Sequence, residues 1–279
     1  MTRIDRQATF LMLPSYIMLA VTFIVPLMWF FVRTLLIDAS PAALPGTILS
    51  VATSRPMLIA TVATIWISIL VTGISLLLGY PLAYYLANHG GPRFTLVIFC
   101  VIVPYFTSVI VRTYSWMVLL GRNGIVNQAL ARLGVIDEPL PLLYNKFAIV
   151  VGMAYVLLPY MVLTLYAAMK AIDPVLLRAA RALGAGGAYV FRRVYLPLSL
   201  HGVISGALIV FILSIGFFIT PSLMGGPSDV MIAMLIERSV EITLDWQTAT
   251  VMSLFLLAVT LLLYAVYYRV TDIRRLVGG

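Results

Sequence analysis

The sequence has few charged residues and almost none of the side chains that hold metals or form disulfides. Its 279 residues include one Cys, two His and only 10% charged residues, whereas soluble domains carry about 25%. Cys100 alone cannot form a disulfide within the chain, and His89 and His201 are too few for a histidine cluster. The composition therefore excludes a water-soluble globule, a disulfide scaffold and a cysteine-rich metal site, and we expect no metal centre.

Long apolar segments take the place of charge. Hydrophobic residues make up 62% of the chain, and its mean hydropathy is +1.08. Charges are absent from five long stretches, and a sixth, 94–121, holds only Arg112. Because a membrane span needs about 20 apolar residues, we predict an all-α polytopic membrane protein, one transmembrane domain over residues 1–279. The six predicted spans cover about 8–33, 57–87, 94–120, 147–170, 198–224 and 246–269.

The first predicted span could instead be a secretory signal peptide, because Arg3 and Arg6 precede it. However, its neutral run of 26 residues, 7–32, is longer than the apolar core of about 7–15 residues in a signal peptide. No small-residue cleavage site is evident either. We therefore expect this segment to be retained as a span.

The distribution of Lys and Arg predicts the orientation of the chain. With six spans, the side that holds both termini carries eleven Lys and Arg against three Asp. The opposite side carries six Lys and Arg against seven Asp and Glu, and Arg112 lies in the membrane. The positive-inside rule then places both termini and the loop 171–197 in the cytoplasm. The net charge of +8 is thereby explained without nucleic-acid binding.

The loop 171–197 carries the signals of a helix–turn–helix. Asp173 is a candidate N-cap, and Pro174 suits the first helical position. Gly184 would end this helix, and a second helical segment over 189–195 would stop near Pro197. The charges alone would also fit a basic loop that only fixes topology.

The residue spacing in this loop is more specific than its charge. Three residues separate Ala179-Ala180 from Gly184, and nine more lead to Val194-x-Leu-Pro197. This resembles the signature loop of ABC importer permeases, Glu-Ala-Ala, three residues, Gly, nine residues, Ile-x-Leu-Pro. The resemblance implies a coupling helix that docks on a separate cytoplasmic ATPase. The candidate coupling residues are Arg178, Ala179, Ala180, Gly184, Val194, Leu196 and Pro197.

The loop departs from the family pattern at two of these positions. Arg178 stands where the family has Glu, which reverses a charge, and Val194 stands where it has Ile. Whatever ion pair the family Glu makes is therefore not carried over to this chain.

Two further stretches, 104–124 and 217–227, resemble the spermidine/putrescine branch of this permease family. The resemblance implies a subunit of an ATP-driven polyamine importer in a bacterial inner membrane. Its implied partners are a second, similar permease in a heterodimer, two ATPase subunits and an extracytoplasmic binding protein. Neither Lys146 nor Lys170 lies in a phosphate-binding Gly-x4-Gly-Lys-Ser/Thr motif. We therefore expect no cofactor and no catalytic residue in this chain, and ATP with Mg²⁺ on the partner ATPase.

Arg112 is the one charge well inside a predicted span. Because burying it costs at least about 2.5–3.5 kcal/mol, a functional role is the default hypothesis. It could face a cavity between subunits and fix a gate through carbonyls or a carboxylate. Alternatively, it could snorkel to the outer interface beside Tyr114 and Trp116. As a cation, Arg112 is not expected to bind a polycation directly.

Pro104, Pro159 and Pro221 each remove a helical hydrogen bond inside a predicted span. The break at Pro221, followed by the sequence Gly-Gly-Pro over 225–227, predicts an irregular gate at the outer end of the fifth span. Phe217 and Phe218 could plug it, or could simply pack or face lipid. The candidate pathway residues are Tyr105, Arg112, Phe217, Phe218, Thr220 and Pro221. Gly202 and Gly206, spaced as Gly-x3-Gly, predict close helix packing.

The outer loop 225–245 carries four acidic residues against Arg238 alone. Such a patch could attract a cationic solute or a basic rim on the delivery protein, with Asp229, Glu237 and Glu241 as candidate contacts. An ordinary solvated loop fits the same residues.

Other functions fit the sequence less well. The predicted spans hold no acidic residue of the kind that ion-coupled carriers use, which argues against a secondary transporter or channel. An intramembrane enzyme would need a nucleophile with a base, and only His201 lies near a span as a candidate base. Within the importer class, another small organic solute, such as an amino-acid derivative or an aminophosphonate, remains an alternative to a polyamine.

Overall fold

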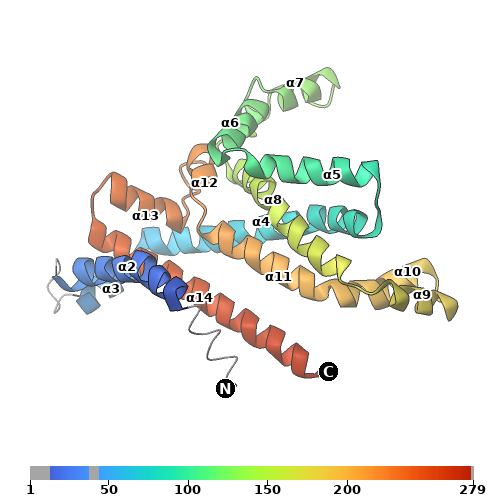
Figure 1. Cartoon of the computed structure of the whole chain (residues 1–279). Coiled ribbons are helices and arrows are strands. Elements are labelled where there is room, and N and C mark those ends of the chain that lie inside the picture. Colours follow the sequence, from blue (N-terminus) through green and yellow to red (C-terminus); the bar gives the residue numbers. More distant parts are fainter. Residues whose placement is uncertain (1–12, 38–43, 278–279) are drawn as a thin grey trace. The chain divides into compact units, whose positions relative to one another are not determined.

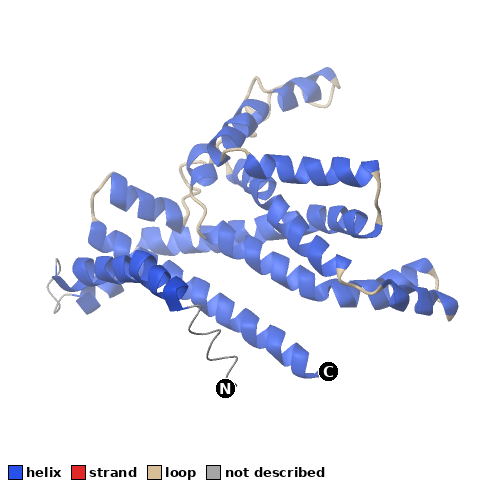
Figure 2. Ribbon diagram, viewed as in Figure 1, coloured by secondary structure: helices blue, strands red, loops and turns tan. Residues whose placement is uncertain are grey.

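The structure is a computed structural model that describes residues 13–37 and 44–277. These residues are nearly all helical, and none of them lies in a strand (Figures 1 and 2). They form two compact units, one within Met1–Ser54 and Ile236–Phe255 and the other within Arg55–Leu235 and Leu256–Gly279.

Five described helices are long and apolar enough to cross a membrane. They are Leu13–Leu35, Arg55–Asn88, Lys146–Lys170, Gly187–Ile215 and Trp246–Ala265. A bent pair, Pro92–Phe106 with Val109–Arg132, makes a sixth if it is counted as one span. The all-α polytopic fold class is thereby confirmed, although the first residues of the expected span 8–33 lie outside the described ones.

The first unit holds the apolar helix near the N-terminus. This helix contains the π-helical turn η1 (Ala20–Ile24) and α2 (Val25–Val32), and η2 (Arg33–Ile37) follows α2. The ring of Phe30 lies 6.2 Å, centroid to centroid, from that of Trp246, the first residue of α14 (Trp246–Val277). The short α3 (Leu44–Ala52) belongs to the same unit, and α13 (Ile232–Glu241) and α14 extend across both units.

The second unit contains the remaining helices in chain order. They are α4 (Arg55–Asn88), α5 (Pro92–Ile102), the 3-10 turn η4 (Val103–Phe106), α6 (Val109–Leu120), α7 (Ile125–Arg132), α8 (Lys146–Lys170), α9 (Pro174–Ala182), α10 (Gly187–Val190), the π-helical turn η5 (Phe191–Tyr195), α11 (Leu196–Ile215) and α12 (Ile219–Met224).

Helix α8 is the centre of the second unit and packs against both α4 and α11. Five of its fully buried side chains recur every four residues, so that each lies about one turn after the last on a stripe that winds gradually around the helix. They are Ile149, Met153, Leu157, Met161 and Leu165. Ile67 and Val71 from α4 and Val210 from α11 belong to the same buried cluster.

Glycines allow the three helices to approach closely. An ideal Cβ on Gly79 of α4 would lie 2.9 Å from Met161 Cγ, and one on Gly206 of α11 would lie 2.9 Å from Met161 Sδ. A Cβ on Gly202 would lie 2.5 Å from the Cβ of Ala168. The sequence-based prediction that Gly202 and Gly206 serve close helix packing is confirmed.

The segment expected as one span over 94–120 is two helices that meet at 107°. Pro104 has no amide hydrogen to extend the helix, and Thr107 is extended, with φ −84° and ψ 142°. Ser108 is also non-helical, with φ −52° and ψ 136°. The chain therefore changes direction between η4 and α6, and Arg112 lies in the first turns after this bend.

The expected helix stop near Pro197 is wrong, because α10, η5 and α11 form one apolar helix from Gly187 to Ile215. A proline ring normally clashes with the carbonyl four residues earlier, here that of Arg193. The wider π-helical turn over Phe191–Tyr195 ends two residues before Pro197 and gives its ring room. The same helix ends at Ile215, so the expected span 198–224 also includes a break and the separate helix α12.

The close contact between α8 and α11 can be tested with a matched pair of substitutions. Gly202→Ala inserts a methyl group against Ala168, and overpacking of this kind costs about 1–3 kcal/mol. Gly73→Ala, at a helical site with no atom within 4 Å of the new Cβ, has no such cost. We expect thermal unfolding in detergent to show a lower Tm for Gly202→Ala and an unchanged or higher Tm for Gly73→Ala. Equal Tm values for the two variants would contradict the packing described.

Candidate functional site

The loop after α8 is a well-defined helical hairpin over residues 173–195, formed by α9, the turn at Gly184 and the start of the helix that begins at Gly187. The Oδ1 of Asp173 accepts a hydrogen bond of 2.8 Å from the amide of Val175, which caps α9 as the sequence predicts. At the other end, the amide of Ala185 donates to the carbonyl of Ala180 and that of Gly184 donates to that of Arg181. These two bonds form a Schellman motif, and Gly184 has the positive φ of 87° that the motif requires.

The outward surface of this hairpin is apolar as well as basic. No residue of α9 is buried, and the four Arg residues at 178, 181, 192 and 193 are exposed. Val175, Leu176 and Tyr189 are also about half exposed, and Leu183 is 89% exposed. Leu183 is not among the candidate coupling residues predicted from the sequence. Its place directly before Gly184, the glycine that ends α9, is a sequence feature that points to an exposed apolar side chain at the tip of the turn.

The predicted coupling residues fall on two different elements. Ala179 lies on the exposed surface of α9, Ala180 is half-buried on the same helix, and Gly184 lies in the turn that follows. Val194, Leu196 and Pro197 instead lie on the continuous helix that leads to α11, where Val194 is half-buried. The spacing of the sequence pattern therefore joins an exposed hairpin to the helix behind it.

Aromatic contacts fasten this hairpin to α4. The ring of Tyr84 lies 5.0 Å from that of Tyr195 and 5.6 Å from that of Phe191, centroid to centroid. The Nδ2 of Asn88 donates a hydrogen bond of 3.0 Å to the Tyr195 hydroxyl. Leu177 on α9 packs against the buried cluster of the second unit. The hairpin is therefore in direct contact with both α4 and the core.

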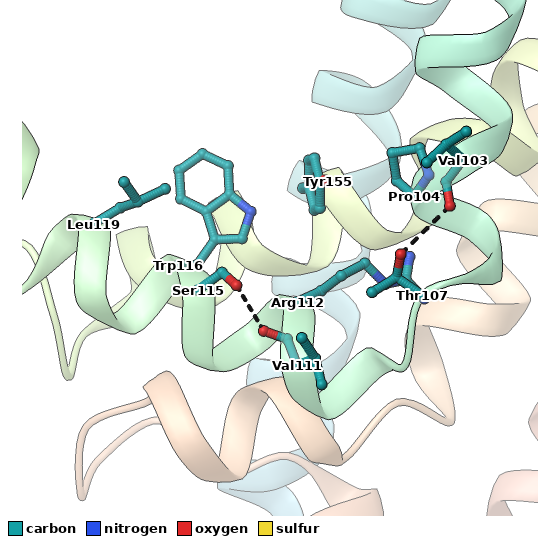
Figure 3. Close-up of a pocket in the computed structure, with 9 residues that line it drawn as sticks. All are labelled: Val103, Pro104, Thr107, Val111, Arg112, Ser115, Trp116, Leu119 and Tyr155. Carbon is teal, nitrogen blue, oxygen red and sulfur yellow. Dashed lines mark hydrogen bonds between the residues drawn. The ribbon is translucent and has the colours of Figure 1, made fainter.

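A pocket of about 320 Å³ lies at the bend between η4 and α6. Figure 3 shows the Arg112 side chain extending from α6 toward the bend. Arg112 is only 7% exposed, so the side chain is buried within the protein and does not reach out along the surface. Besides Arg112, the lining includes Val103, Pro104, Thr107, Ser115, Trp116 and Tyr155.

Aromatic rings surround the same bend. The ring of Trp116 contacts that of Tyr155 at 5.5 Å between centroids, and the ring of Tyr105 contacts that of Tyr160 at 5.4 Å. Both pairs link the α5–α6 segment to α8. Tyr105 and Arg112, which the sequence analysis selects as pathway residues, thus lie on opposite sides of the same bend.

Helix α12 is joined to α6 by a buried hydrogen bond. The hydroxyls of Thr113 and Thr220 lie 3.0 Å apart, and both side chains are buried. An ideal Cβ on Gly152 of α8 would lie 2.7 Å from Thr220 Cγ2, so α12 is also tightly seated on α8. Phe217 packs against the core cluster, whereas Phe218 is 40% exposed.

Asp229 does not belong to an exposed acidic patch, contrary to the sequence-based expectation. It is 4% exposed, and its Oδ2 accepts a hydrogen bond of 3.3 Å from the amide of Gly226. Its Oδ1 lies 3.9 Å from the Nζ of Lys146. The carboxylate therefore holds the loop after α12 to the start of α8. Glu241 is exposed and Glu237 is half-buried.

Known relatives match most of the chain. It is 35% identical over 209 residues to the spermidine/putrescine transport system permease protein PotB of Haemophilus influenzae, covering 74% of this chain and 73% of the relative. It is 37% identical over 194 residues to PotB of Escherichia coli, covering 70% of each protein. Among solved structures, a bacterial ABC transporter involved in the import of the polysaccharide alginate matches with a TM-score of 0.66 at 17% identity. That match covers 96% of this chain and 97% of the other, and it supports the fold.

A family model matches residues 76–274, a range that includes the α9 hairpin, the bend at α6 and helix α12. The family is described as the binding-protein-dependent transport system inner membrane component. With the apolar helices described above, this match identifies a multi-pass inner membrane protein and a transport component rather than an enzyme. The chain belongs to the family of binding-protein-dependent transport system inner membrane components.

Proposed function

We propose that the chain is the permease subunit of an ATP-driven importer for polyamines such as spermidine and putrescine. The observation that carries the ATP-driven mechanism is the α9 hairpin, which exposes Leu183 and basic side chains on a rigidly capped helix. The polyamine specificity is supported by the two PotB relatives, whose names specify spermidine and putrescine.

The proposed assembly contains four kinds of subunit besides the lipid bilayer. A second permease of the same family, in a heterodimer, would complete the pathway, and two cytoplasmic ATPase subunits would bind ATP and Mg²⁺. An extracytoplasmic binding protein would deliver the solute to the outer face. The charge distribution supports cytoplasmic termini, since eleven Lys and Arg lie on that side against three Asp.

The proposed coupling runs from the hairpin to the core. The ATPase would hold α9 and Leu183, and a displacement there would move Leu177, Phe191 and Tyr195, which contact the core or α4. Such a rigid-body movement between two arrangements is a common way to switch a protein between states.

The hairpin surface can be tested with Leu183→Asp. Burying a Leu contributes about 1.5–3 kcal/mol, and each 1.4 kcal/mol changes affinity about tenfold. We expect this variant to reduce co-purification of the ATPase by about tenfold or more, and ATP-driven uptake in proportion. Because Leu183 is 89% exposed in this chain, its own folding and membrane insertion should be unchanged.

The matched control is Leu133→Asp, another exposed Leu that follows α7 and lies outside the hairpin. It should co-purify with the ATPase as the wild type does. Gly184→Pro provides a second test, because proline fixes φ near −65° where the hairpin has 87°. Undiminished ATPase binding by both Leu183→Asp and Gly184→Pro would eliminate the proposed coupling surface.

The proposed gate is α12, held to α6 by the Thr113–Thr220 hydrogen bond and to α8 by Asp229 and Lys146. Opening the pathway would separate α12 from one of these neighbours. Thr220 and Pro221 would thus form the buried side of the gate, which packs on the neighbouring helices, with Phe218 exposed beside them.

The Thr113–Thr220 bond can be measured by a double-mutant cycle with Thr113→Val and Thr220→Val. Hydrogen bonds between membrane helices average about 0.6 kcal/mol and reach about 1.7 kcal/mol, so we expect a coupling energy in this range. Thr164, whose hydroxyl donates only within its own helix, to the carbonyl of Tyr160, is the control partner. A cycle between Thr164→Val and Thr220→Val should give no coupling. A zero value for both cycles would remove the bond as a gate contact.

The solute can be identified by uptake into proteoliposomes that contain the permeases, the ATPase and the binding protein. We expect uptake of radiolabelled putrescine and spermidine that depends on ATP on the side of the membrane where the ATPase subunits lie. Uptake that needs only an ion gradient would indicate a secondary transporter. ATP-dependent uptake of an amino-acid derivative or an aminophosphonate, with no uptake of polyamines, would keep the importer class and change the solute.

A further inference from the structure

The guanidinium of Arg112 is buried without a counter-ion in the described part of the chain. Arg112 is 7% exposed, and its Nε and Nη1 atoms have no hydrogen-bond partner there. No described Asp or Glu lies within 4.0 Å of it, and the buried Asp229 is engaged by Lys146 and Gly226. A buried donor group left without a partner is destabilising, and more so when the group is charged.

The pocket at Arg112 offers this guanidinium to a ligand. The hydroxyl protons of Thr107 and Ser115 in its lining are already used, because Thr107 donates to the carbonyl of Val103 and Ser115 donates to that of Val111. The remaining lining named above is apolar or aromatic, so Arg112 is the strong donor of the site. A guanidinium presents two parallel N–H groups that match the two oxygens of a carboxylate.

The pocket volume is consistent with a small ligand group. At about 320 Å³, it lies at the lower end of the range of about 300–1,000 Å³ that is typical of small-molecule sites. A free ammonium group would be repelled by the positive charge, and a cation therefore does not fit. A doubly charged phosphate would find only one cationic side chain in the pocket, whereas a single carboxylate would be neutralised by it.

We propose that the pocket formed by Arg112, Thr107, Ser115, Trp116 and Tyr155 is a carboxylate-binding site. The carboxylate comes either from an acidic side chain of another subunit of the assembled transporter or from an acidic group on a transported solute. In both cases the same ion pair forms beside Thr113, which is hydrogen-bonded to Thr220 of α12. Filling the pocket therefore acts next to the proposed gate.

The chemistry of the site is tested on the purified full-length chain in detergent, with acetate as the probe. Thermal unfolding is followed while sodium acetate replaces sodium chloride at constant ionic strength. We expect the Tm of the wild type to rise with acetate concentration and that of Arg112→Gln to stay constant. Arg122→Gln, which removes an exposed Arg outside the pocket, should respond as the wild type does. No acetate-specific rise in the wild type, or an equal rise in Arg112→Gln, would overturn the proposal.

The source of the carboxylate is tested on the assembled transporter. If another subunit supplies it, the acetate effect disappears on assembly, and Arg112→Gln lowers co-purification of that subunit. If the solute supplies it, the acetate effect persists on assembly. Ornithine, which is putrescine with one added carboxylate, should then be taken up by the wild type, and Arg112→Gln should lower the ratio of ornithine uptake to putrescine uptake. Either result supports the site and identifies its occupant. An assembled transporter in which Arg112→Gln changes neither co-purification nor uptake of either solute would contradict the proposal.

The acetate measurement does not depend on transport. It can fail while ATP-dependent polyamine uptake is observed, and it can succeed if polyamines are not the solute. Failure of this proposal is thus distinguishable from failure of the proposed function.

Discussion

The second unit depends on the contact that Met161 makes with two other helices. Its side chain occupies the space left by Gly79 on α4 and by Gly206 on α11. In a membrane, lipid tails are as apolar as the core, so helix association relies on close packing rather than on escape from water. The flexible thioether side chain of Met161 provides that packing, because it fills the space beside both glycines. The helices α4, α8 and α11 are therefore brought together at this one residue. The other contacts of this unit form on the scaffold that these three helices make.

The two candidate functional regions use this scaffold differently. The hairpin of α9 is fixed by local bonds, namely the Asp173 cap and the turn at Gly184, and leaves its outer surface uncovered. The region of α6 and α12 is fixed by contacts between distant parts of the chain, such as Thr113 with Thr220. A locally determined element keeps its shape when it binds a partner. An element held by long-range contacts changes when those contacts are exchanged, which suits a gate.

The sequence was sufficient to predict the features that rest on local chemistry. Apolar run length predicted the helical, polytopic fold, and the Asp173 cap and the glycine turn were read from residue type alone. The Gly-x3-Gly spacing correctly indicated the close approach at Gly202 and Gly206. The burial of Asp229 was not predictable, because it depends on Lys146 and Gly226, which the fold brings beside it. The bend at Thr107 and the passage of a helix through Pro197 also depend on backbone geometry that apolar run length does not report.

The π-helical turn before Pro197 has a mechanical consequence. Because it lets the helix continue through the proline, one rod runs from Gly187 at the hairpin to Ile215, directly before the Gly216 break that leads to α12. At about 1.5 Å per residue, the 29 residues of this helix form a lever arm of roughly 43 Å. A tilt of about 5° applied at one end would displace the other by roughly 4 Å over that length. If the helix stopped at Pro197, the chain would have a hinge there, and bending at this hinge would absorb part of the displacement.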